Sequence, residues 1–512
     1  MSLESFAAAA GLMCEKGAIR TPRESFADTV TTLLARGARL TLMYATDDRE
    51  MSGDFGVHAA LAIPREVDLV TVSTVVPAHD ASYPSLTKSC MAAHWYERQM
   101  HDQFGIVAVG HPDWRRLMHH ENIPEGTYPL RKDFAWDTRL AHAAVPYPMH
   151  QVEGKGVYEI PVGPIHAGII EPGHFRFNVR GERILTLEGK LFFTHKGVEK
   201  LVEGRTPEEA LPFVERVSGD MPVGHTLAYV QAVERVCAAV VPERAEYLRT
   251  IYNELERVTM HVFDIGNIGG NGTGFTFMAA QGFRNVEILR RLFAQHVGHR
   301  FLRGAITLGG AHDLSGAAVQ DIVATVERVT ADMQQVIDIA YASDGLMERF
   351  ETTGILTREA AGAYGAEGVA ARASGVDRDM RRDHPYAAYQ HSAPSVITET
   401  AGDVAARFAV RVRELLESLR LIKSCAAALP EGAVQAPLVY RAGSAYGWAE
   451  AWRGGVVDWV RMDSAGKIDR LVIRDPSFCN WPLFGELAPG NIVPDFPLCN
   501  KSLNLSYSGT DL

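Results

Sequence analysis

The chain has 512 residues, enough for about three average domains or two larger ones, with the apolar and charged fractions of an ordinary globular protein. Its net charge of -11 argues against general binding to nucleic-acid backbones, which requires clustered Lys and Arg. No uninterrupted apolar run reaches the roughly 20 residues that span a bilayer. An acidic residue precedes the first apolar stretch, which makes a poor signal peptide, so we expect a cytoplasmic protein.

The cysteine pattern indicates no metal or disulfide framework. The sequence has six cysteines, and no two of them are separated by the two-residue gap of a zinc, iron–sulfur or redox pair. We therefore interpret them as small apolar core residues in a reducing compartment. They are Cys14, Cys90, Cys237, Cys425, Cys479 and Cys499.

The first part of the chain has the pattern of an α+β domain. A helix is predicted near residues 25–34, and three strands follow in "RLTLMYA", "FGVHAALAI" and "VDLVTVSTVV", which are rich in β-branched or alternating apolar residues. Another helix carries "AAHWYERQMHDQFG". Residues 110–134 are dense in Pro, Gly and charge, which is typical of an ordered loop.

The segment "LAHAAVPYPMHQVEGKG" has small residues, prolines and no clear periodicity, as linkers do. We place a domain boundary there, giving domains at residues 1–145 and 146–512. The second domain begins with short strands in "FRFNVRGERILTLEGKLFFTH". It then becomes strongly helical, with apolar residues at helical spacing in residues 225–240, 244–264, 285–302, 317–340 and 403–421. We expect a mainly α-helical domain with a small β portion at its start.

Generic catalytic motifs do not explain this chain. "GGNGTGF" at residues 269–275 lacks the Lys-Ser/Thr pair of a phosphate loop and follows a helix rather than a strand. We interpret it as a turn between helices. The sequence contains neither a G-x-S-x-G elbow nor an H-E-x-x-H pair.

Several long stretches resemble one family over nearly the whole chain. "HWYERQMHDQFGI", "GHPDWRRL" and "PLRKDF" are similar to the 30-kDa-type (C) subunit of respiratory complex I. "VGPIHAGIIEPGHFRF", "LFFTHKGVEKLVEG", "VERVSGDMPVGHTLAYVQAVE" and "HVFDIGNIGG" are similar to its 49-kDa-type (D) subunit. They resemble even more closely the large subunit of membrane-bound group 4 [NiFe] hydrogenases of the formate hydrogenlyase type, in which the two parts are fused in this order.

The resemblance implies where nickel ligands would stand. In the hydrogenases two C-x-x-C pairs hold nickel and iron, in segments resembling "ERVCGIC" and "DPCYSCTDR". Here these segments are "ERVSGDM" and "NLSYSGTDL", so the ligand positions are Ser218, Met221, Ser506 and Gly509. None is a thiolate, and soft thiolates are what a nickel–iron centre requires. We therefore expect no [NiFe] centre and no cofactor bound by this chain.

Two further expectations concern the vacated pocket and the end of the chain. A different metal on Ser218, Asp220, His225 and Asp511 is one alternative, and a hydrogen-bonded plug made by these groups is the other. In nickel-loaded relatives a C-terminal extension is removed after metal insertion. Leu512 takes the place of the residue at that cut, so we expect a subunit that does not enter nickel maturation.

Complex I, which also lacks these ligands, places a quinone headgroup in the cavity, bound by a Tyr and a His with an Asp behind the His. The Asp matches Asp264, the His matches His166 or His174, and the Tyr falls at Arg216. This departure matters because a guanidinium donates hydrogen bonds but supplies no proton.

Three helix and loop residues have competing interpretations. Glu199 matches a proton-carrying glutamate of the hydrogenases, and a surface ion pair with Lys196 or Lys200 is the alternative. His225 either lines the cavity or is a satisfied core histidine. Arg411 lies in an apolar helix pattern and should pair with an acid, Asp403 being one candidate.

We expect a subunit of a membrane-associated oxidoreductase complex of the NADH-quinone oxidoreductase or hydrogenase type, peripheral on the cytoplasmic face of the inner membrane. The resemblance implies two partners: a small subunit that carries an iron–sulfur cluster, similar to the complex I B subunit, and membrane-embedded ion-translocating subunits. The candidate cavity residues are His166, His174, Glu199, Arg216 and Asp264. A quinone or another small electron acceptor in the cavity is one hypothesis, and a non-catalytic coupling or scaffold subunit is the alternative. An active [NiFe] hydrogenase is the third.

Overall fold

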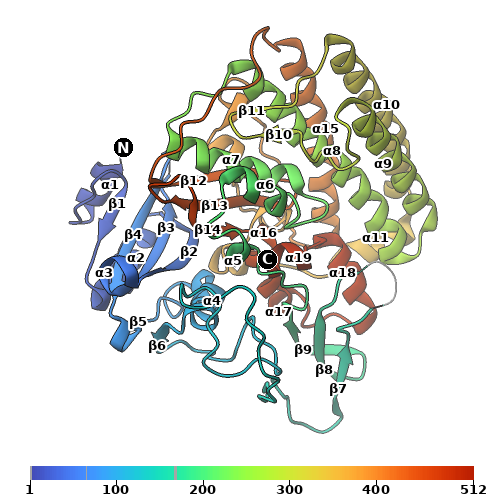
Figure 1. The fold of residues 1–512 in the computed structure, drawn as a ribbon. Helices are drawn as coiled ribbons and strands as arrows, with labels where there is room; N and C mark the ends of the chain where they lie inside the picture. Colours follow the sequence, from blue (N-terminus) through green and yellow to red (C-terminus); the bar gives the residue numbers. More distant parts are fainter. Residues whose placement is uncertain (1–2, 65, 167–169) are drawn as a thin grey trace.

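The computed structural model describes residues 3–64, 66–166 and 170–512. Figure 1 shows the first part of the chain, in blue, as a sheet with helices to one side of the molecule, and the rest as a larger helical body. The predicted fold class is confirmed: an α+β N-terminal part precedes a mainly helical part that begins with a small sheet.

The N-terminal part contains a four-stranded sheet in the order β1-β4-β3-β2. The three long strands are antiparallel to one another and coincide with the predicted strand segments. Alternating apolar residues account for them, since both faces of β2 and β3 are almost wholly buried. The strands are β1 (Ala18–Arg20), β2 (Arg39–Asp48), β3 (Asp54–Ala62) and β4 (Leu69–Val76).

Two helices accompany this sheet, α2 (Phe26–Ala35) and α4 (His94–Phe104), as the sequence predicts. The predicted loop arm at residues 110–134 contains no helix or strand and is nevertheless fixed. Buried Asp102 of α4 accepts hydrogen bonds from the backbone N–H groups of Leu117 and Met118, at 2.9 and 2.7 Å. A charged side chain therefore supplies the order that secondary structure does not.

After the linker, an antiparallel sheet of β7 (Val157–Val162), β8 (His174–Arg180) and β9 (Arg183–Lys190) begins the second part. The linker is tied down: the backbone N–H of His150 donates to Glu188 at 2.8 Å, and Lys190 Nζ lies 3.5 Å from the ring centroid of Tyr147. The linker therefore follows the surface of this sheet rather than extending freely.

Five long helices build the core of the second part, at the positions that apolar periodicity predicts. They are α7 (Pro222–Cys237), α8 (Glu243–Thr273), α9 (Thr276–His296), α10 (Gly316–Tyr341) and α15 (Val404–Ala427). Helix α8 is buried along most of its length and packs against α7, α9 and α15, so it is the central helix of the body.

The glycine-rich segment 269–275 is not a turn, and that prediction was wrong. Residues 269–273 complete α8, and the chain turns only at Gly274 and Phe275. The glycines allow α8 and α9 to approach closely: a Cβ on Gly270 would collide with Ala279, and one on Gly266 would collide with Gly282 of α9. Close helix packing, not a turn or a ligand, accounts for this motif.

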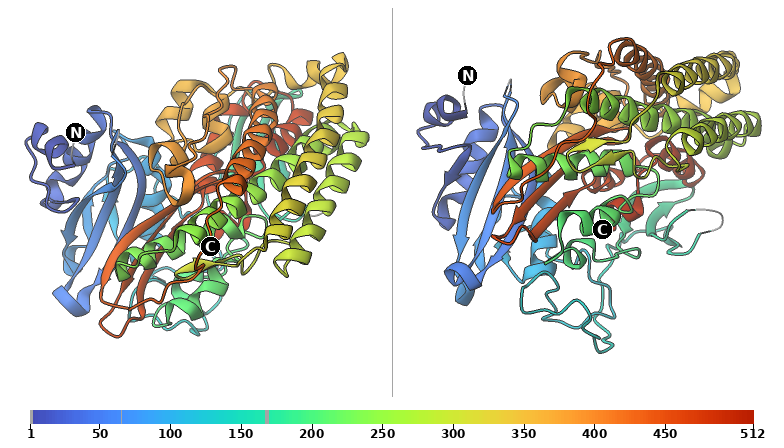
Figure 2. Two further views of the ribbon diagram at one scale, coloured as in Figure 1. Left: turned by 90° about the horizontal axis from the view of Figure 1, so that it is seen from above. Right: turned by 45° about the horizontal axis from the view of Figure 1, so that its top comes forward.

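A third sheet near the C-terminus was not predicted. Strands β12 (Gly443–Ala451), β13 (Gly454–Met462) and β14 (Ile468–Arg474) form an antiparallel sheet in chain order. It lies between the N-terminal sheet and the helices (Figure 2), and α7 packs on β12 and β13. Its strands are buried on both faces, so they lack the alternation that marks a half-exposed strand.

Short helices connect these elements and carry the C-terminal segment. Those near the site are α5 (Val198–Leu201), α6 (Pro207–Val214), α16 (Pro476–Asn480), α17 (Phe484–Leu487), α18 (Phe496–Leu503) and α19 (Tyr507–Asp511). The remaining short elements are α1 (Leu3–Ala9), α3 (Arg49–Ser52), β5 (Ser82–Pro84), β6 (Val107–Val109), β10 (Ile306–Thr307), β11 (Gly310–Ala311), α11 (Asp344–Phe350), α12 (Arg358–Ala363), α13 (Gly368–Ala373) and α14 (Met380–Asp383).

The two parts share a packed interface formed by β2 and the third sheet. The Tyr446 hydroxyl lies 2.9 Å from both the Tyr44 and Thr71 hydroxyls, and the Tyr44 ring lies 4.8 Å from the Trp459 ring. Ion pairs cross the same interface, among them Arg461–Asp48 at 2.7 Å. Two aromatic layers and buried charges therefore join the parts.

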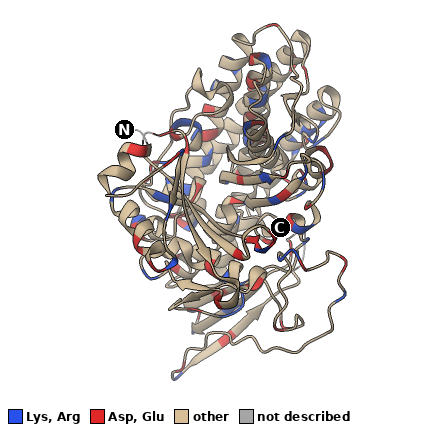
Figure 3. Ribbon diagram, turned by 60° about the vertical axis from the view of Figure 1, so that its left-hand side comes forward, with Lys and Arg blue, Asp and Glu red and all other residues tan. Residues whose placement is uncertain are grey.

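Two surface properties bear on the expected setting. Lys and Arg residues lie among Asp and Glu residues across the view in Figure 3, as the sequence composition indicates. Within the described part of the chain, no helix combines the length and the apolar character that membrane crossing requires.

The interface gives a stability test. Buried Glu367 pairs with Arg474 of β14 and with Arg39 of β2, both at 2.8 Å. We expect Glu367→Ala to lower the free energy of unfolding by about 3–5 kcal/mol, because it leaves a buried guanidinium unpaired. Arg39→Ala is the matched control and should cost about 1 kcal/mol, since Glu367 keeps Arg474. Urea denaturation measures both, and equal losses would contradict the role of Glu367.

Candidate functional site

The two segments that resemble nickel-ligand motifs meet in the fold. Ser218 precedes α7, Ser506 begins α19, and their hydroxyl oxygens lie 3.0 Å apart although 288 positions separate them in sequence. Ser506 is the N-cap of α19, because its hydroxyl accepts the backbone N–H of Gly509 at 2.9 Å. The capping preference of serine and the packing of α19 against α16 thus set this geometry.

These hydroxyls belong to one hydrogen-bonded chain. Ser218 has a single hydroxyl proton and donates it to Asp220 Oδ1 at 3.0 Å, so Ser506 donates to Ser218. Asp220 in turn accepts both terminal nitrogens of Arg453, at 2.6 and 2.8 Å. Burial opposes its ionisation, but Arg453 outweighs burial and holds the pKa of Asp220 below its ordinary value. We call this the Ser506–Ser218–Asp220 chain.

The other two ligand positions are filled differently. Met221 is fully buried in the apolar core. A Cβ at Gly509 would collide with the carboxylate of Asp475. That carboxylate accepts from His225 Nε2 at 3.0 Å and from the backbone N–H of Ser477 at 2.7 Å. His225 is therefore a core histidine bonded to a buried acid, and Asp475 stands where a side chain at position 509 would be.

These residues do not fit a nickel–iron centre. A thiolate set needs four sulfur donors converging on one point, whereas here two hydroxyls bond each other, Met221 packs into the core and Asp475 occupies the space beside Gly509. The alternative metal set does not converge either, because Asp511 accepts from Thr194 and from the backbone of Phe192. Among the described residues no group of His, Cys, Asp and Glu has the geometry of a metal site.

A cavity of about 520 Å³ lies directly beside the Ser506–Ser218–Asp220 chain. Its polar wall offers hydrogen-bond donors from α18, the segment that follows it, and β13. The aromatic wall comes from α8, α9 and α19. The lining residues that matter here are Ser218, Asp220, Arg453, Asn500, Lys501, Asn504, Ser506, Tyr507, Phe263 and Phe283.

Asp264 lies behind this wall rather than in it. It is fully buried on α8, its Oδ2 lies 2.6 Å from Arg411 of α15, and its Oδ1 accepts from Asn504 at 2.6 Å. Burial raises the pKa of Asp264 to about 6, against the lowering effect of Arg411. The expectation that Arg411 pairs with an acid is thus confirmed, and the acid is Asp264 rather than Asp403.

The other quinone candidates do not surround Asp264. His166 Nε2 lies 2.8 Å from the carbonyl of Gly173, and His174 Nδ1 lies 3.1 Å from the carbonyl of Gly163, so both rings bind backbone of their own loop. Arg216 is exposed and donates to the carbonyl of Pro212 at 2.6 Å. None of the three is in the cavity wall.

Glu199 is buried on α5, and neither interpretation from the sequence names its partner. Its carboxylate accepts from Arg470 at 3.0 Å and from the backbone N–H of Ile473 at 3.0 Å, both on β14. The surface pair with Lys196 or Lys200 is wrong, since Lys200 binds Glu203 and Lys196 binds the carbonyl of Ser508.

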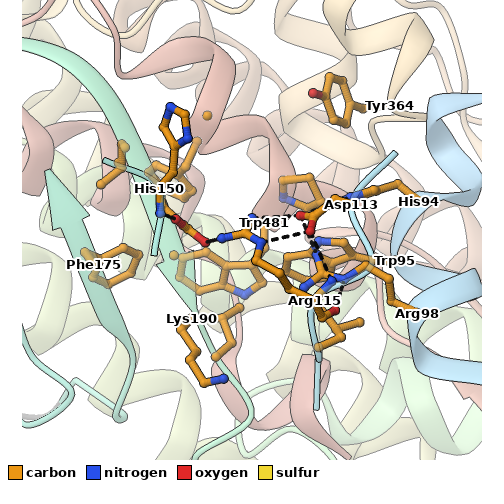
Figure 4. A pocket seen from close by; sticks show the side chains of 18 of the residues that line it. His94, Trp95, Arg98, Asp113, Arg115, His150, Phe175, Lys190, Tyr364 and Trp481 are labelled. Carbon is orange, nitrogen blue, oxygen red and sulfur yellow. Dashed lines mark hydrogen bonds and ion pairs between the residues drawn. The ribbon is translucent and has the colours of Figure 1, made fainter. Parts of the chain in front are cut away.

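A second cavity, of about 350 Å³, lies at the junction of α4, the loop arm, the linker and β9. Figure 4 shows Asp113 and Arg115 side by side within it, joined by dashed lines. Its charges are satisfied internally, because Arg115 binds both oxygens of Asp113 and also pairs with Glu188. Trp481 lines this cavity and donates its indole N–H to the carbonyl of Ser506 at 3.1 Å, so the two cavities share one wall.

Sequence reasoning did not single out Asp475, Arg453 and Asn504. Asp475 carries a local signal: it stands before Pro476 and its side chain caps α16, a common N-cap and N1 pair. Arg453 and Asn504 have no comparable signal, because their partners are 233 and 240 positions away in sequence.

Family comparisons match three parts of the chain. Residues 19–139 match the family described as respiratory-chain NADH dehydrogenase, 30 kDa subunit. Residues 272–442 match its 49 kDa subunit, and residues 196–265 match nickel-dependent hydrogenase.

Individual relatives cover most of the chain. Hydrogenase-4 component G of Escherichia coli (strain K12) is 33% identical over 92% of this chain and 83% of its own length. Formate hydrogenlyase subunit 5 of the same strain is 33% identical, over 93% and 85%. The fused C/D 2 subunit of the NADH-quinone oxidoreductase of Aquifex aeolicus (strain VF5) is 26% identical, over 88% and 87%.

One solved structure is also similar to this fold. It is a chain of the membrane-bound sulfane sulfur reductase, an archaeal respiratory membrane complex. The TM-score is 0.66 with 26% identity, over 72% of this chain and all of that chain.

The space beside Gly509 gives a packing test. We expect Gly509→Ala to lower the free energy of unfolding by about 1–3 kcal/mol, because its Cβ meets Asp475. Combined with Asp475→Ala, the two losses should be less than additive, since the collision is then removed. Gly219→Ala is the matched control: a Cβ there meets nothing within 4 Å, and the change should stay within about 0.5 kcal/mol. Additive losses in denaturation would contradict the contact.

The burial of Asp264 gives a pH test. Its pKa of about 6 in the folded protein lies above the ordinary value, so its stabilising contribution is present below about pH 4 and is lost as the pH rises through 6. The difference in unfolding free energy between wild type and Asp264→Asn should fall by about 3 kcal/mol from pH 4 to pH 7. Denaturation at a series of pH values measures it, and a difference that rises with pH would reverse the sign.

Proposed function

The chain belongs to the family of fused 30-kDa and 49-kDa-type (C/D) subunits of complex I-like and group 4 hydrogenase-related membrane complexes, and from this premise we propose that it serves such a complex without nickel. In this proposal the cavity beside Ser218 and Ser506 takes a small electron acceptor, and its reduction is coupled to ion translocation by partner subunits. Family membership fixes the fold but not the chemistry, so the proposal rests on the site.

The observation that carries the proposal is the cavity itself. Its volume of about 520 Å³ is of the size that holds a small organic ligand. Asn500, Lys501 and Arg453 supply donors in its wall, and aromatic rings supply an apolar face. A quinone headgroup has carbonyl oxygens that accept hydrogen bonds at the edge of a planar ring, and a polysulfide or sulfane sulfur acceptor would use the same cationic donors.

Tyr507 supplies the group that Arg216 lacks. Its ring lines the cavity, and its hydroxyl has no hydrogen-bond partner among the described residues. Burial raises the pKa of Tyr507 to about 12, so the hydroxyl keeps its proton at neutral pH and can donate to a bound acceptor. We therefore assign to Tyr507 the donor role that the sequence comparison had placed at position 216.

The proposal includes the setting of the subunit. A small iron–sulfur subunit would deliver electrons to the cavity, and membrane-embedded subunits would hold this chain at the cytoplasmic face. The solved relative is described as part of a respiratory membrane complex, which supports such an assembly.

A second function is favoured by a different observation. The former ligand positions are bonded to one another through the Ser506–Ser218–Asp220 chain, as in a hydrogen-bonded plug. A coupling or scaffold subunit without chemistry of its own would have such a filled centre. The two functions differ in whether the neighbouring cavity binds an acceptor.

Blocking the cavity separates them. Gly219 lines it with open space in front of its Cα, so Gly219→Phe places a ring in the cavity. We expect this change to weaken binding of a soluble quinone analogue to the purified native complex by tenfold or more, which is about 1.4 kcal/mol or more. Tyr507→Phe should weaken it by about tenfold through the lost hydrogen bond.

Gly219→Ala and Arg216→Ala are the controls, and both should bind the analogue like wild type. Elemental analysis of the same complex should find no stoichiometric nickel. Unchanged binding in Gly219→Phe would reject the cavity as the acceptor site and favour the scaffold function, and stoichiometric nickel would reject both.

A further inference from the structure

Asp458 is a fully buried acid without a partner. It lies on β13, and neither carboxyl oxygen has a hydrogen-bond partner among the described residues. Burial raises the pKa of Asp458 well above its ordinary value, so the group is protonated at neutral pH. A carboxyl group in this position is costly unless water or a function accounts for it.

The register of the third sheet shows what surrounds it. Asp458 stands opposite Ile473 of β14, whose backbone N–H donates to Glu199, and opposite Gly447 of β12. A Cβ on Gly447 would collide with the backbone of Ala228 in α7, so α7 covers this face of the sheet. Asp458 therefore lies between β14, the adjoining α5 and α7.

The charged neighbours come from each of these elements. Glu199 of α5 and Asp475 of α16 add to the effect of burial on the pKa of Asp458, and Arg474 of β14 opposes it. On α7, burial and nearby acids, Asp458 among them, raise the pKa of Tyr229 well above its ordinary value. Tyr229 is one turn after His225, so Asp458 is near both the Glu199 end and the His225 end of this region.

The other buried acids of the region each have a fixed partner. Glu199 binds Arg470, Asp475 binds His225, and Asp264 binds Arg411. Opposite Asp458, His225 offers a complementary group: its Nε2–H is given to Asp475, so Nδ1 has a free lone pair, and this atom is also buried without a partner. An unpaired acid and an unpaired base thus face the same interior region.

We infer that Asp458 is a proton carrier that connects Glu199, at the edge of β14, with the His225–Asp475 pair beneath the cavity. Buried water bridges the unpartnered oxygens of Asp458 and Nδ1 of His225, as it commonly does between orphaned polar groups. This inference rests on the proposed function, because an acceptor reduced in the cavity must take up protons.

The transfer is balanced at each group. The Asp458 carboxyl gives its proton through water to Nδ1 of His225, and the Nε2 proton of His225 passes to Asp475. Asp458 then regains a proton delivered past Glu199, so no net charge remains on it. Asp475 stands against Gly509 and Ser506, and Ser506 lines the cavity.

The supply side is also a cavity. The face of α5 that carries Lys196 and Lys200 lines a separate cavity of about 390 Å³ together with His195. Glu199, on the same helix, is directed to β14 instead. The route thus leads from one cavity to the other across a single sheet.

Infrared spectroscopy of the native complex tests the route without any turnover. The difference between wild type and Asp458→Asn isolates the carboxylic C=O band of Asp458. We expect this band at neutral pH, and we expect it to shift in D₂O before the backbone amides of β13 exchange. Glu199→Gln should slow that shift by about 10²-fold, the effect typical of a lost proton-transfer group. If Asp458→Asn does not assemble, Asp458→Glu, which keeps an acid, identifies the band by its displacement.

Glu256→Gln is the matched control. Burial raises the pKa of Glu256 to about 8, and its carboxyl is fixed by the backbone N–H groups of Val223 and Gly224, away from the route. The control should remove its own band and leave the shift of the Asp458 band unchanged. A missing Asp458 band, a shift that occurs only with the β13 amides, or a shift unaffected by Glu199→Gln would each overturn the inference.

Turnover separates this inference from the proposed function. Reduction of the quinone analogue should fall by about 10²-fold in Asp458→Asn and recover in Asp458→Glu. Undiminished reduction in Asp458→Asn rejects the route and leaves the proposed function standing. No reduction by the wild-type complex, together with an exchange that depends on Glu199, rejects the proposed function and supports the route.

Discussion

The carboxylate of Asp475 fills the space in which a side chain at position 509 would stand, and His225 and the N-terminus of α16 hold it there. A buried carboxylate needs such partners, so its position is fixed rather than adjustable. The start of α19 depends on it, because only glycine fits against it at position 509. Ser506 can then cap α19 and bond Ser218, and the Ser506–Ser218–Asp220 chain follows from that contact.

The same constraint separates this centre from the metal centre that its motifs resemble. Side chains that converge on a metal have been replaced by side chains that satisfy one another, and the neighbouring space remains as a cavity. Relatives described as hydrogenase components, a quinone oxidoreductase subunit and a sulfane sulfur reductase share this scaffold. A scaffold that supports several chemistries is one in which the few residues around such a centre decide the reaction.

Buried charge also joins the centre to the rest of the molecule. Asn504 links the C-terminal segment to Asp264 of α8, and Asp264 links it to Arg411 of α15. One turn farther along α15, Glu414 pairs with Arg257 of α8 and with Arg372. Breaking one member of such a network leaves an uncompensated charge, so the helices and the cavity wall hold one arrangement.

Local patterns were sufficient for most elements of this fold. Periodicity located α7, α8, α10 and α15, alternation located β2–β4, and the two ligand-like motifs indicated that residues near 218 and 506 form one centre. The same reasoning missed β12–β14, because strands buried on both faces lack alternation, and it took the glycines of α8 for a turn although they serve helix packing.

The sequence by itself determined the elements, the two-part order of the chain and the absence of thiolates at the ligand positions. Only the tertiary structure decided which groups fill that centre. Asp475 rather than a solvent-filled gap adjoins Gly509, Arg411 rather than a histidine holds Asp264, and Arg470 rather than a surface lysine holds Glu199. Helix and strand patterns arise from neighbours a few residues apart, whereas a buried charge selects its partner by proximity in the folded chain, here across 147–271 positions.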